Sequence, residues 1–137
     1  MSVDPAILRA RALLGVPFRL HGRSAEIGLD CVGLVALAHD RVAEAPNGYA
    51  MRGGQPERWV ALLDCMLERA ERSEPAPGDV LLMQASVAQI HCGLWAGSSL
   101  IHADIRLRRV VETPGPPAWP ILGVWRRRTE GISSWPH

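Results

Sequence analysis

The 137-residue sequence predicts a single α+β domain in which N-terminal helices pack on a small antiparallel sheet. Three observations lead to this prediction. The length suits one domain, since a chain of this size rarely holds two. Helical periodicity fills the first half of the chain, and short aliphatic runs separated by Gly, Pro and Ser fill the second. Hydrophobic residues make up 47% and charged residues 21%, which is typical of a globular protein. We assign residues 1–128 to the domain and residues 129–137 to a C-terminal tail.

Three helices are expected in the first half. The first covers residues 4–15, because an Asp-Pro pair suits a helix start and a glycine suits its end. The second begins at Asp30 and ends at the turn-forming residues 45–48. It is apolar on nearly every face, which indicates a helix in the centre of its domain. The third covers residues 56–70, where apolar residues recur at helical spacing. Residues 15–29 carry several Gly and Pro residues and are expected to form a loop.

The second half is expected to fold as an antiparallel meander. Its aliphatic runs have the length of strands, and turn-forming residues separate them. The runs cover residues 79–84, 90–96, 99–103, 107–111 and 121–126.

Net charge and cysteine content exclude several classes of protein. A formal net charge of +1 gives no overall attraction to nucleic acid or to an anionic membrane. The 3 cysteines contain no C-x-x-C pair, so they form neither a disulfide framework nor a zinc ribbon. The sequence shows no secretory signal and no apolar run near the ~20 residues that cross a bilayer. We therefore expect synthesis in the cytoplasm without a signal peptide, with no nucleic-acid partner and no membrane insertion.

Cys31 is the candidate nucleophile. It lies in the first turn of the predicted central helix, where unpaired N–H groups and partial positive charge favour the thiolate. Gly33 would leave room beside it for a substrate backbone. The alternative is that Cys31 is a small buried hydrophobic residue.

Two histidines on adjacent predicted strands are the candidate partners of this thiol. Strand alternation places His91 on one face and Cys92 on the other, where Cys92 is expected to be core. His102 follows eleven residues after His91, a separation that fits a hairpin. His91 would act as the general base, and His102, or Asp104 as its rival, would orient the ring. The alternatives are a satisfied core histidine at 91 and a surface strand histidine at 102.

A metal site is the competing interpretation of the same residues. Cys31, His91 and His102 could bind zinc, because Cys and His are its common ligands. We rank this site below catalysis, since structural zinc ligands usually come in close pairs along the chain and none is present. We therefore expect no metal and no other cofactor. Cys65 lies off the apolar stripe of its helix and is expected to be partly exposed, and neither Cys65 nor Cys92 has a predicted neighbour that would activate it.

Five segments, in order, resemble the motifs of the NlpC/P60 cysteine peptidases. The first two resemble the family's G-x-P-Y segment and its D-C-S-G-L-V helix start. The third resembles its P-G-D strand, the fourth its H-V-G-I-Y strand, and the fifth the strand that carries the third catalytic residue. The segments are residues 15–22, 28–35, 77–81, 90–95 and 100–103.

This resemblance implies a compact papain-like domain. Cys31 would be the nucleophile, His91 the base and His102 the orienting residue. Substrate would lie against the loop and the first turn of the central helix, at Phe18, Asp30, Val32 and Gly33. Phe18 stands where the family often has Tyr, and Val32 where Ser usually follows the cysteine, so the substrate preference is expected to differ.

The resemblance also implies a function. The family cleaves amide bonds in peptidoglycan stem peptides, commonly between D-glutamate and diaminopimelate, without a cofactor. The variant motifs look most like phage-type cell-wall peptidases, including those of gene transfer agents. We therefore expect a component of a phage-like tail tip, beside hub proteins, that acts in the periplasm of a target cell. Two alternatives stay open: a catalytically inactive papain-like module of a tail assembly, and an acyltransferase or amidase with another substrate.

Overall fold

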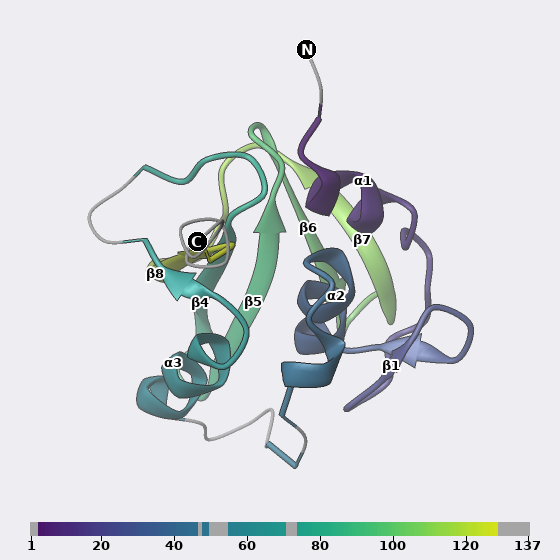
Figure 1. Cartoon of the computed structure of the whole chain (residues 1–137), viewed down its shortest axis with the longest axis horizontal. Coiled ribbons are helices and arrows are strands. Elements are labelled where there is room, and N and C mark those ends of the chain that lie inside the picture. The colour runs from purple at the N-terminus through teal and green to yellow at the C-terminus, as the bar shows by residue number, and fades with distance from the viewer. Residues whose placement is uncertain (1–2, 47, 50–54, 71–73, 129–137) are drawn as a thin grey trace, which may run out of the picture.

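A computed structural model of the chain describes residues 3–46, 48–49, 55–70 and 74–128. The three α-helices precede every strand of a 6-stranded antiparallel sheet, and they cover one of its faces (Figure 1). The predicted α+β class is therefore confirmed. The predicted C-terminal tail lies outside the described residues. Within them, no helix is long and apolar enough to cross a membrane.

The predicted meander holds for four consecutive strands and is wrong for the last one. The strand order in the sheet is β3-β8-β4-β5-β6-β7, so β8 pairs with β4 rather than with β7. The reason is the burial of Trp125, whose indole N–H donates to Asp64 of α3 at 2.8 Å. The strands are β3 (Glu68–Arg69), β4 (Val80–Ser86), β5 (Gln89–Trp95), β6 (Ser99–Asp104), β7 (Arg109–Pro114) and β8 (Ile121–Arg126).

All three helices are shorter than predicted. Helix α1 (Pro5–Arg11) stops before the predicted glycine and is followed by turns. Helix α3 (Pro56–Asp64) ends at its cap Cys65, because the chain then turns away to pair β3 with β8. Its apolar stripe continues past the helix, so periodicity alone overestimated its length. Cys65 is exposed, as expected.

Helix α2 (Cys31–Ala38) lies at the centre of the domain, as predicted, but it ends before the predicted turn, because Asp40 takes a left-handed backbone conformation with φ +58°. All of its residues except Leu37 are buried, and they form one core with α1, α3 and the sheet. The helix contacts α1, β5 and β6. A short 3₁₀ turn, η1 (Val42–Glu44), follows it.

The predicted loop before α2 contains a small antiparallel pair, β1 (Arg23–Ser24) and β2 (Gly28–Leu29). This pair lies against the start of α2, where backbone segments approach very closely. A Cβ at Gly33 would lie 2.0 Å from the backbone oxygen of Gly22. The absence of a side chain at Gly33 therefore lets the loop dock on the helix.

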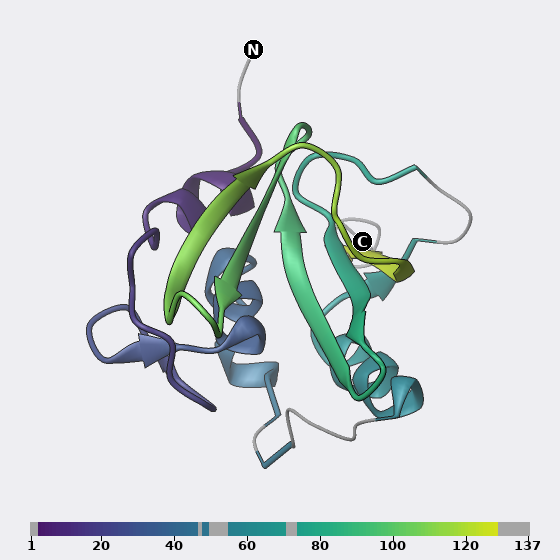
Figure 2. The same cartoon turned by 180° about the vertical axis from the view of Figure 1, so that it is seen from behind.

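Strands β5 and β6 diverge, and this opens the sheet where the candidate histidines lie. The two strands pair only at Leu94↔Ile101 and Trp95↔Leu100. Beyond these pairs the strands separate, as the middle of Figure 2 shows, and α2 lies behind β6 at the edge of the gap and contacts both strands. The helix start can therefore be reached from both strands.

Gly33→Ala tests the packing of the loop on α2. We expect a fall in the free energy of unfolding of about 3 kcal/mol, because the added Cβ collides with backbone that cannot rotate away. Gly15→Ala is the control, since its Cβ meets nothing within 4 Å and its φ of +88° brings only local strain, about 1–2 kcal/mol. Urea unfolding of both variants measures the difference. Equal losses would contradict the packing argument.

Candidate functional site

Cys31, His91 and His102, far apart in sequence, lie together at the start of α2. Cys31 is the first residue of the helix, and His91 is near enough to lower the pKa of its thiol. His91 Nε2 lies 3.1 Å from His102 Nδ1, and the two rings meet edge to face. The exposed fractions are 0%, 8% and 4%, so the whole group is shielded from water.

His102, and not Asp104, touches His91. The carboxylate of Asp104 accepts hydrogen bonds from the backbone N–H groups of Arg106 and Leu107, at 2.8 and 3.1 Å, and so caps its own turn. His102 Nε2 faces Thr113 Oγ1 at 3.4 Å, on the neighbouring strand β7. His91, His102 and Thr113 therefore form a line of contacts from β5 through β6 to β7.

The thiol of Cys31 is strongly acidified. Its pKa falls from 9.0 to about 6, first because the Cys92 thiol hydrogen-bonds to the sulfur and then because His91 does. Burial and the charge of Asp30 act in the opposite direction. The pKa of Cys92 is raised well above its usual value by Cys31 and by burial, so Cys92 remains a thiol and can donate its proton.

Cys92 is therefore more than a core residue. It is buried on the face of β5 opposite His91, as the strand alternation predicts. No neighbour activates the thiol of Cys92, since Cys31 raises its pKa. The sequence analysis did not predict the contact itself, which arises because α2 packs on that face and begins with Cys31.

The second histidine is held neutral. Burial and the neighbouring His91 lower the pKa of His102 from 6.5 to about 4. At neutral pH it therefore serves as a hydrogen-bonding partner of His91 rather than as a cation.

Trp119 covers the two imidazoles from the face of the sheet opposite the helices. Its ring is edge-on to His91 and His102, with centroids 5.6 and 5.8 Å away. Two cavities lie next to Trp119, and both are lined by Trp119 and His102. The first has a volume of about 220 Å³ and is also lined by Arg106. The second has a volume of about 320 Å³ and is also lined by Thr113. Neither cavity is lined by Cys31.

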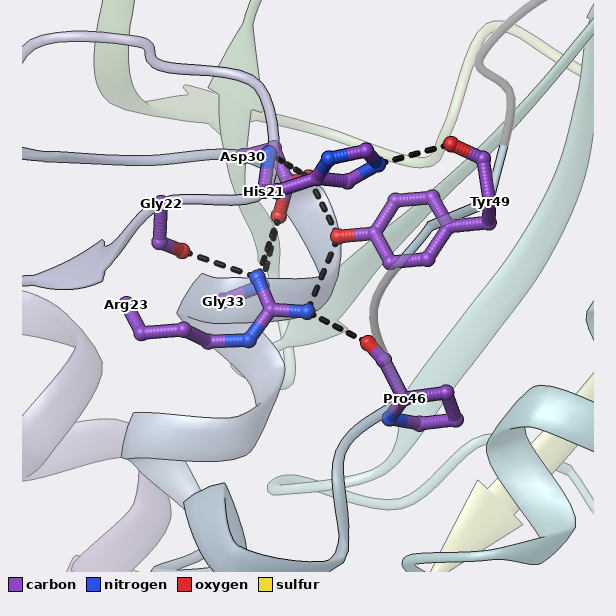
Figure 3. Close-up of polar contacts among 7 residues, drawn as sticks. All are labelled: His21, Gly22, Arg23, Asp30, Gly33, Pro46 and Tyr49. Atoms are coloured by element: carbon purple, nitrogen blue, oxygen red, sulfur yellow. Dashed lines mark hydrogen bonds and ion pairs between the residues drawn. The ribbon is translucent and has the colours of Figure 1, made fainter.

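A polar network fixes Asp30, the residue before Cys31 (Figure 3). Asp30 is fully buried, and its Oδ1 accepts from Gly33 N at 2.8 Å and from Arg23 Nη1 at 3.1 Å. Its Oδ2 accepts from His21 N at 2.8 Å and from the hydroxyl of Tyr49. Both oxygens thus have two donors each, and the carboxylate caps α2.

The predicted substrate contacts lie close to this network. Phe18 is partly buried against the core, and Asp30 and Val32 are fully buried. The space beside Gly33 holds the chain's own backbone, so the room expected there for a substrate is absent. Contact of these residues with substrate stays a prediction.

Tyr49 is a site residue that the sequence analysis missed. The chain contains a single tyrosine, Tyr49. Its phenolic hydroxyl donates a hydrogen bond to Asp30, so the site has a phenol even though Phe18 stands where the family often has Tyr. Nothing in the local sequence pattern marks it, because its contact depends on how the segment after α2 folds back. The one feature of the sequence that could have drawn attention to Tyr49 is that the chain has no other tyrosine.

The same side chains do not converge on a metal. Among the described residues, no group of three His, Cys, Asp or Glu side chains is arranged to hold a metal ion. His91 and His102 direct nitrogen atoms at each other rather than at a shared centre.

The sequence matches no protein-family model and no curated protein, whereas its structure matches solved structures. NlpC1 from Trichomonas vaginalis is 19% identical over 93% of this chain and 45% of that chain, with a TM-score of 0.66. The NlpC/p60 domain of the peptidoglycan hydrolase SagA is 20% identical over 80% and 86%, with a TM-score of 0.54. The peptidoglycan hydrolase RipB from Mycobacterium tuberculosis is 20% identical over 89% and 62%, with a TM-score of 0.52.

These likenesses concern the fold. This chain spans less than half of the Trichomonas vaginalis protein and most of the SagA domain, so the shared part is one domain. The papain-like architecture predicted from the sequence motifs is confirmed: the chain has the fold of an NlpC/P60 domain.

Proposed function

We propose that this protein is a cysteine peptidase that hydrolyses amide bonds in peptidoglycan stem peptides, between D-glutamate and diaminopimelate. The observation that carries the proposal is the line of contacts from Cys31 through His91 to His102, with an acidified thiol at its end. Solved structures of the same fold include proteins named as peptidoglycan hydrolases, which supports the substrate class.

The hydrogen bonds suggest one assignment of protons. His91 Nε2–H donates to His102 Nδ1, and His102 Nε2–H donates toward Thr113. This leaves Nδ1 of His91 free to take the proton of Cys31. His102 thus selects the tautomer of His91, which is the task of the third member of a catalytic triad.

The reaction follows from this arrangement. The thiolate of Cys31 attacks the scissile carbonyl carbon and forms a tetrahedral intermediate. Backbone N–H groups in the first turn of α2 stabilise its oxyanion by a few kcal/mol, roughly; the N–H of Gly33 is not one of them, because it is bonded to Asp30. Protonated His91 gives its proton to the leaving amine, which leaves a thioester. Water, deprotonated by His91, then hydrolyses the thioester and restores the thiol.

Access to the sulfur requires a movement, because Cys31 is fully buried. Trp119 stands between the two cavities at His102, so a peptide lying across both would displace its ring. The segment that carries Trp119 is tethered at both ends, by Gly115 N to Ser98 O at 2.9 Å and by Gln84 N to Pro120 O at 3.0 Å. A swing of this segment is the movement we expect substrate to cause.

The biological setting that we propose is a phage-like tail tip, from which the enzyme would open the cell wall in the periplasm of a target cell beside hub proteins. This rests on the variant motifs of the sequence. The second candidate function is an inactive module that only binds within such a tail, and the complete burial of the sulfur favours it.

Cys31→Ser tests the peptidase. It should lower the release of peptide fragments from purified sacculi by a factor of ~10³ or more, because a hydroxyl is not ionised at this site. Cys65→Ser, which changes an exposed thiol, should keep full activity. Mass spectrometry of the released fragments identifies the bond. Full activity of Cys31→Ser would rule out the mechanism, and a folded but inactive wild-type protein would favour the binding module.

Cys92→Val tests the acidification of the nucleophile. The thiolate of Cys31 should form with a midpoint near pH 6 in the wild type, measured by its ultraviolet absorbance. Removing the Cys92 thiol should move this midpoint upward, since it is the largest cause of the lowered pKa. The Cys31→Ser variant provides the baseline to subtract. An unchanged midpoint in Cys92→Val would show that the second thiol does not act on the first.

His102→Gln tests the neutral state of the second histidine. Its folded pKa of about 4 lies below the usual 6.5, so its contribution to stability is complete above pH 6.5 and is lost as the pH falls through 4. Between pH 7 and pH 4, the wild type should lose about 2–3 kcal/mol more of its free energy of unfolding than the variant. Urea unfolding at both pH values measures this, and equal losses would contradict it.

A further inference from the structure

Asp30 presents an electrostatic problem to the nucleophile. Its carboxylate immediately precedes Cys31 and is fully buried. A buried negative charge disfavours a second one nearby, and the charge of Asp30 does raise the pKa of Cys31. A thiolate at this position therefore requires a positive charge that offsets the carboxylate.

Arg23 of β1 supplies that charge. Its Nη1 lies 3.1 Å from Asp30 Oδ1, and the Arg23 side chain is only 16% exposed, so water screens the pair weakly. The guanidinium is held in place by carbonyl oxygens as well: Nη1 donates to Gly22 O at 2.9 Å and Nη2 to Pro46 O at 2.8 Å. Its charge also lowers the pKa of Cys92, the neighbour of Cys31.

Tyr49 connects the carboxylate of Asp30 and the guanidinium of Arg23. Its hydroxyl donates to Asp30 and accepts from Arg23 Nη2 at 3.0 Å (Figure 3). Burial, together with Asp30, raises the pKa of the phenol, so it stays protonated and remains a donor. His21 Nε2 lies 2.7 Å from the backbone oxygen of Tyr49, which ties this segment to the loop before α2.

We infer that Arg23 and Tyr49 are positioning residues of the cysteine site, which act through Asp30. Arg23 offsets the charge of the carboxylate and Tyr49 shares its second oxygen, so that Asp30 can cap α2 without suppressing the thiolate of Cys31. The inference takes the nucleophile from the proposed function, but ionisation of the thiol can be measured without any substrate.

The groups that act on Cys31 come from every side. Cys92 and His91, on opposite faces of β5, both act on its thiol, Asp30 precedes it, and Arg23 lies behind Asp30 on β1. His102 acts only through His91. Variants that change one charge at a time can therefore separate the contribution of the Arg23–Asp30 pair.

The experiment is a pH titration of the Cys31 thiolate by ultraviolet absorbance in the full chain. Arg23→Gln keeps the length of the side chain and donors but removes the charge, so the midpoint should rise by roughly one pH unit. Arg23→Lys should restore most of the shift, and Tyr49→Phe should give a smaller rise. Asp30→Asn should lower the midpoint, and Arg23→Gln combined with Asp30→Asn should return it near the wild-type value.

An electrostatic role predicts that the midpoint of the Cys31 thiolate rises in Arg23→Gln and falls in Asp30→Asn. These opposite shifts distinguish it from a merely structural role. If the network only held the loop in place, Arg23→Gln and Asp30→Asn would move the midpoint in the same direction, and that result would overturn the inference. An unchanged midpoint in Arg23→Gln would overturn it as well. Should Arg23→Gln fail to fold by circular dichroism, Asp30→Asn and the double variant decide. Failure of the wild type to cleave sacculi would leave these shifts intact, so it would count against the proposed function alone.

Discussion

The site depends on one buried carboxylate at the start of one buried helix. Asp30 caps α2 through Gly33 N–H and holds the preceding loop through His21 N–H, so a single side chain sets where Cys31 stands. A carboxylate buried this completely is stable only when it is paired and all its acceptor sites are used. The loop, β1 and the segment that ends in Tyr49 supply those donors. The irregular first part of the chain is thus organised around this charge.

The sheet contributes a second constraint, which is the divergence of β5 and β6. Had the strands remained paired past Leu94, the gap between the histidines and the helix start would be closed by backbone hydrogen bonds. Because they part, His91 reaches Cys31 from one side while its other nitrogen reaches His102. The helix dipole, the imidazole and the Cys92 thiol then act on the same sulfur in a site from which water is excluded, where each interaction is stronger than at the surface.

Local patterns in the sequence were sufficient for the parts of the fold that depend on neighbours along the chain. The capping Asp30, the central position of α2 and the hairpin that joins His91 to His102 all follow from short-range rules, and the structure has them. The pairing of β8 with β4, the end of α3 and the contact of Tyr49 with Asp30 depend on packing between distant segments, which periodicity does not encode. The partnership of Cys92 with Cys31 was missed for a similar reason: alternation gives the face of a strand but not which helix end lies on it.

The two buried cysteines differ in the direction of their pKa shifts. Cys31 and Cys92 are in contact and equally buried, and burial alone raises the pKa of any thiol. Cys92 behaves in this way, whereas the pKa of Cys31 moves in the opposite direction. Each thiol is the largest cause of the other's shift, and His91 adds to the lowering at Cys31. A protein that needed two small apolar residues here would gain nothing from an ionisable one. The asymmetry is what acyl transfer requires: a thiolate, and next to it a proton donor that stays protonated.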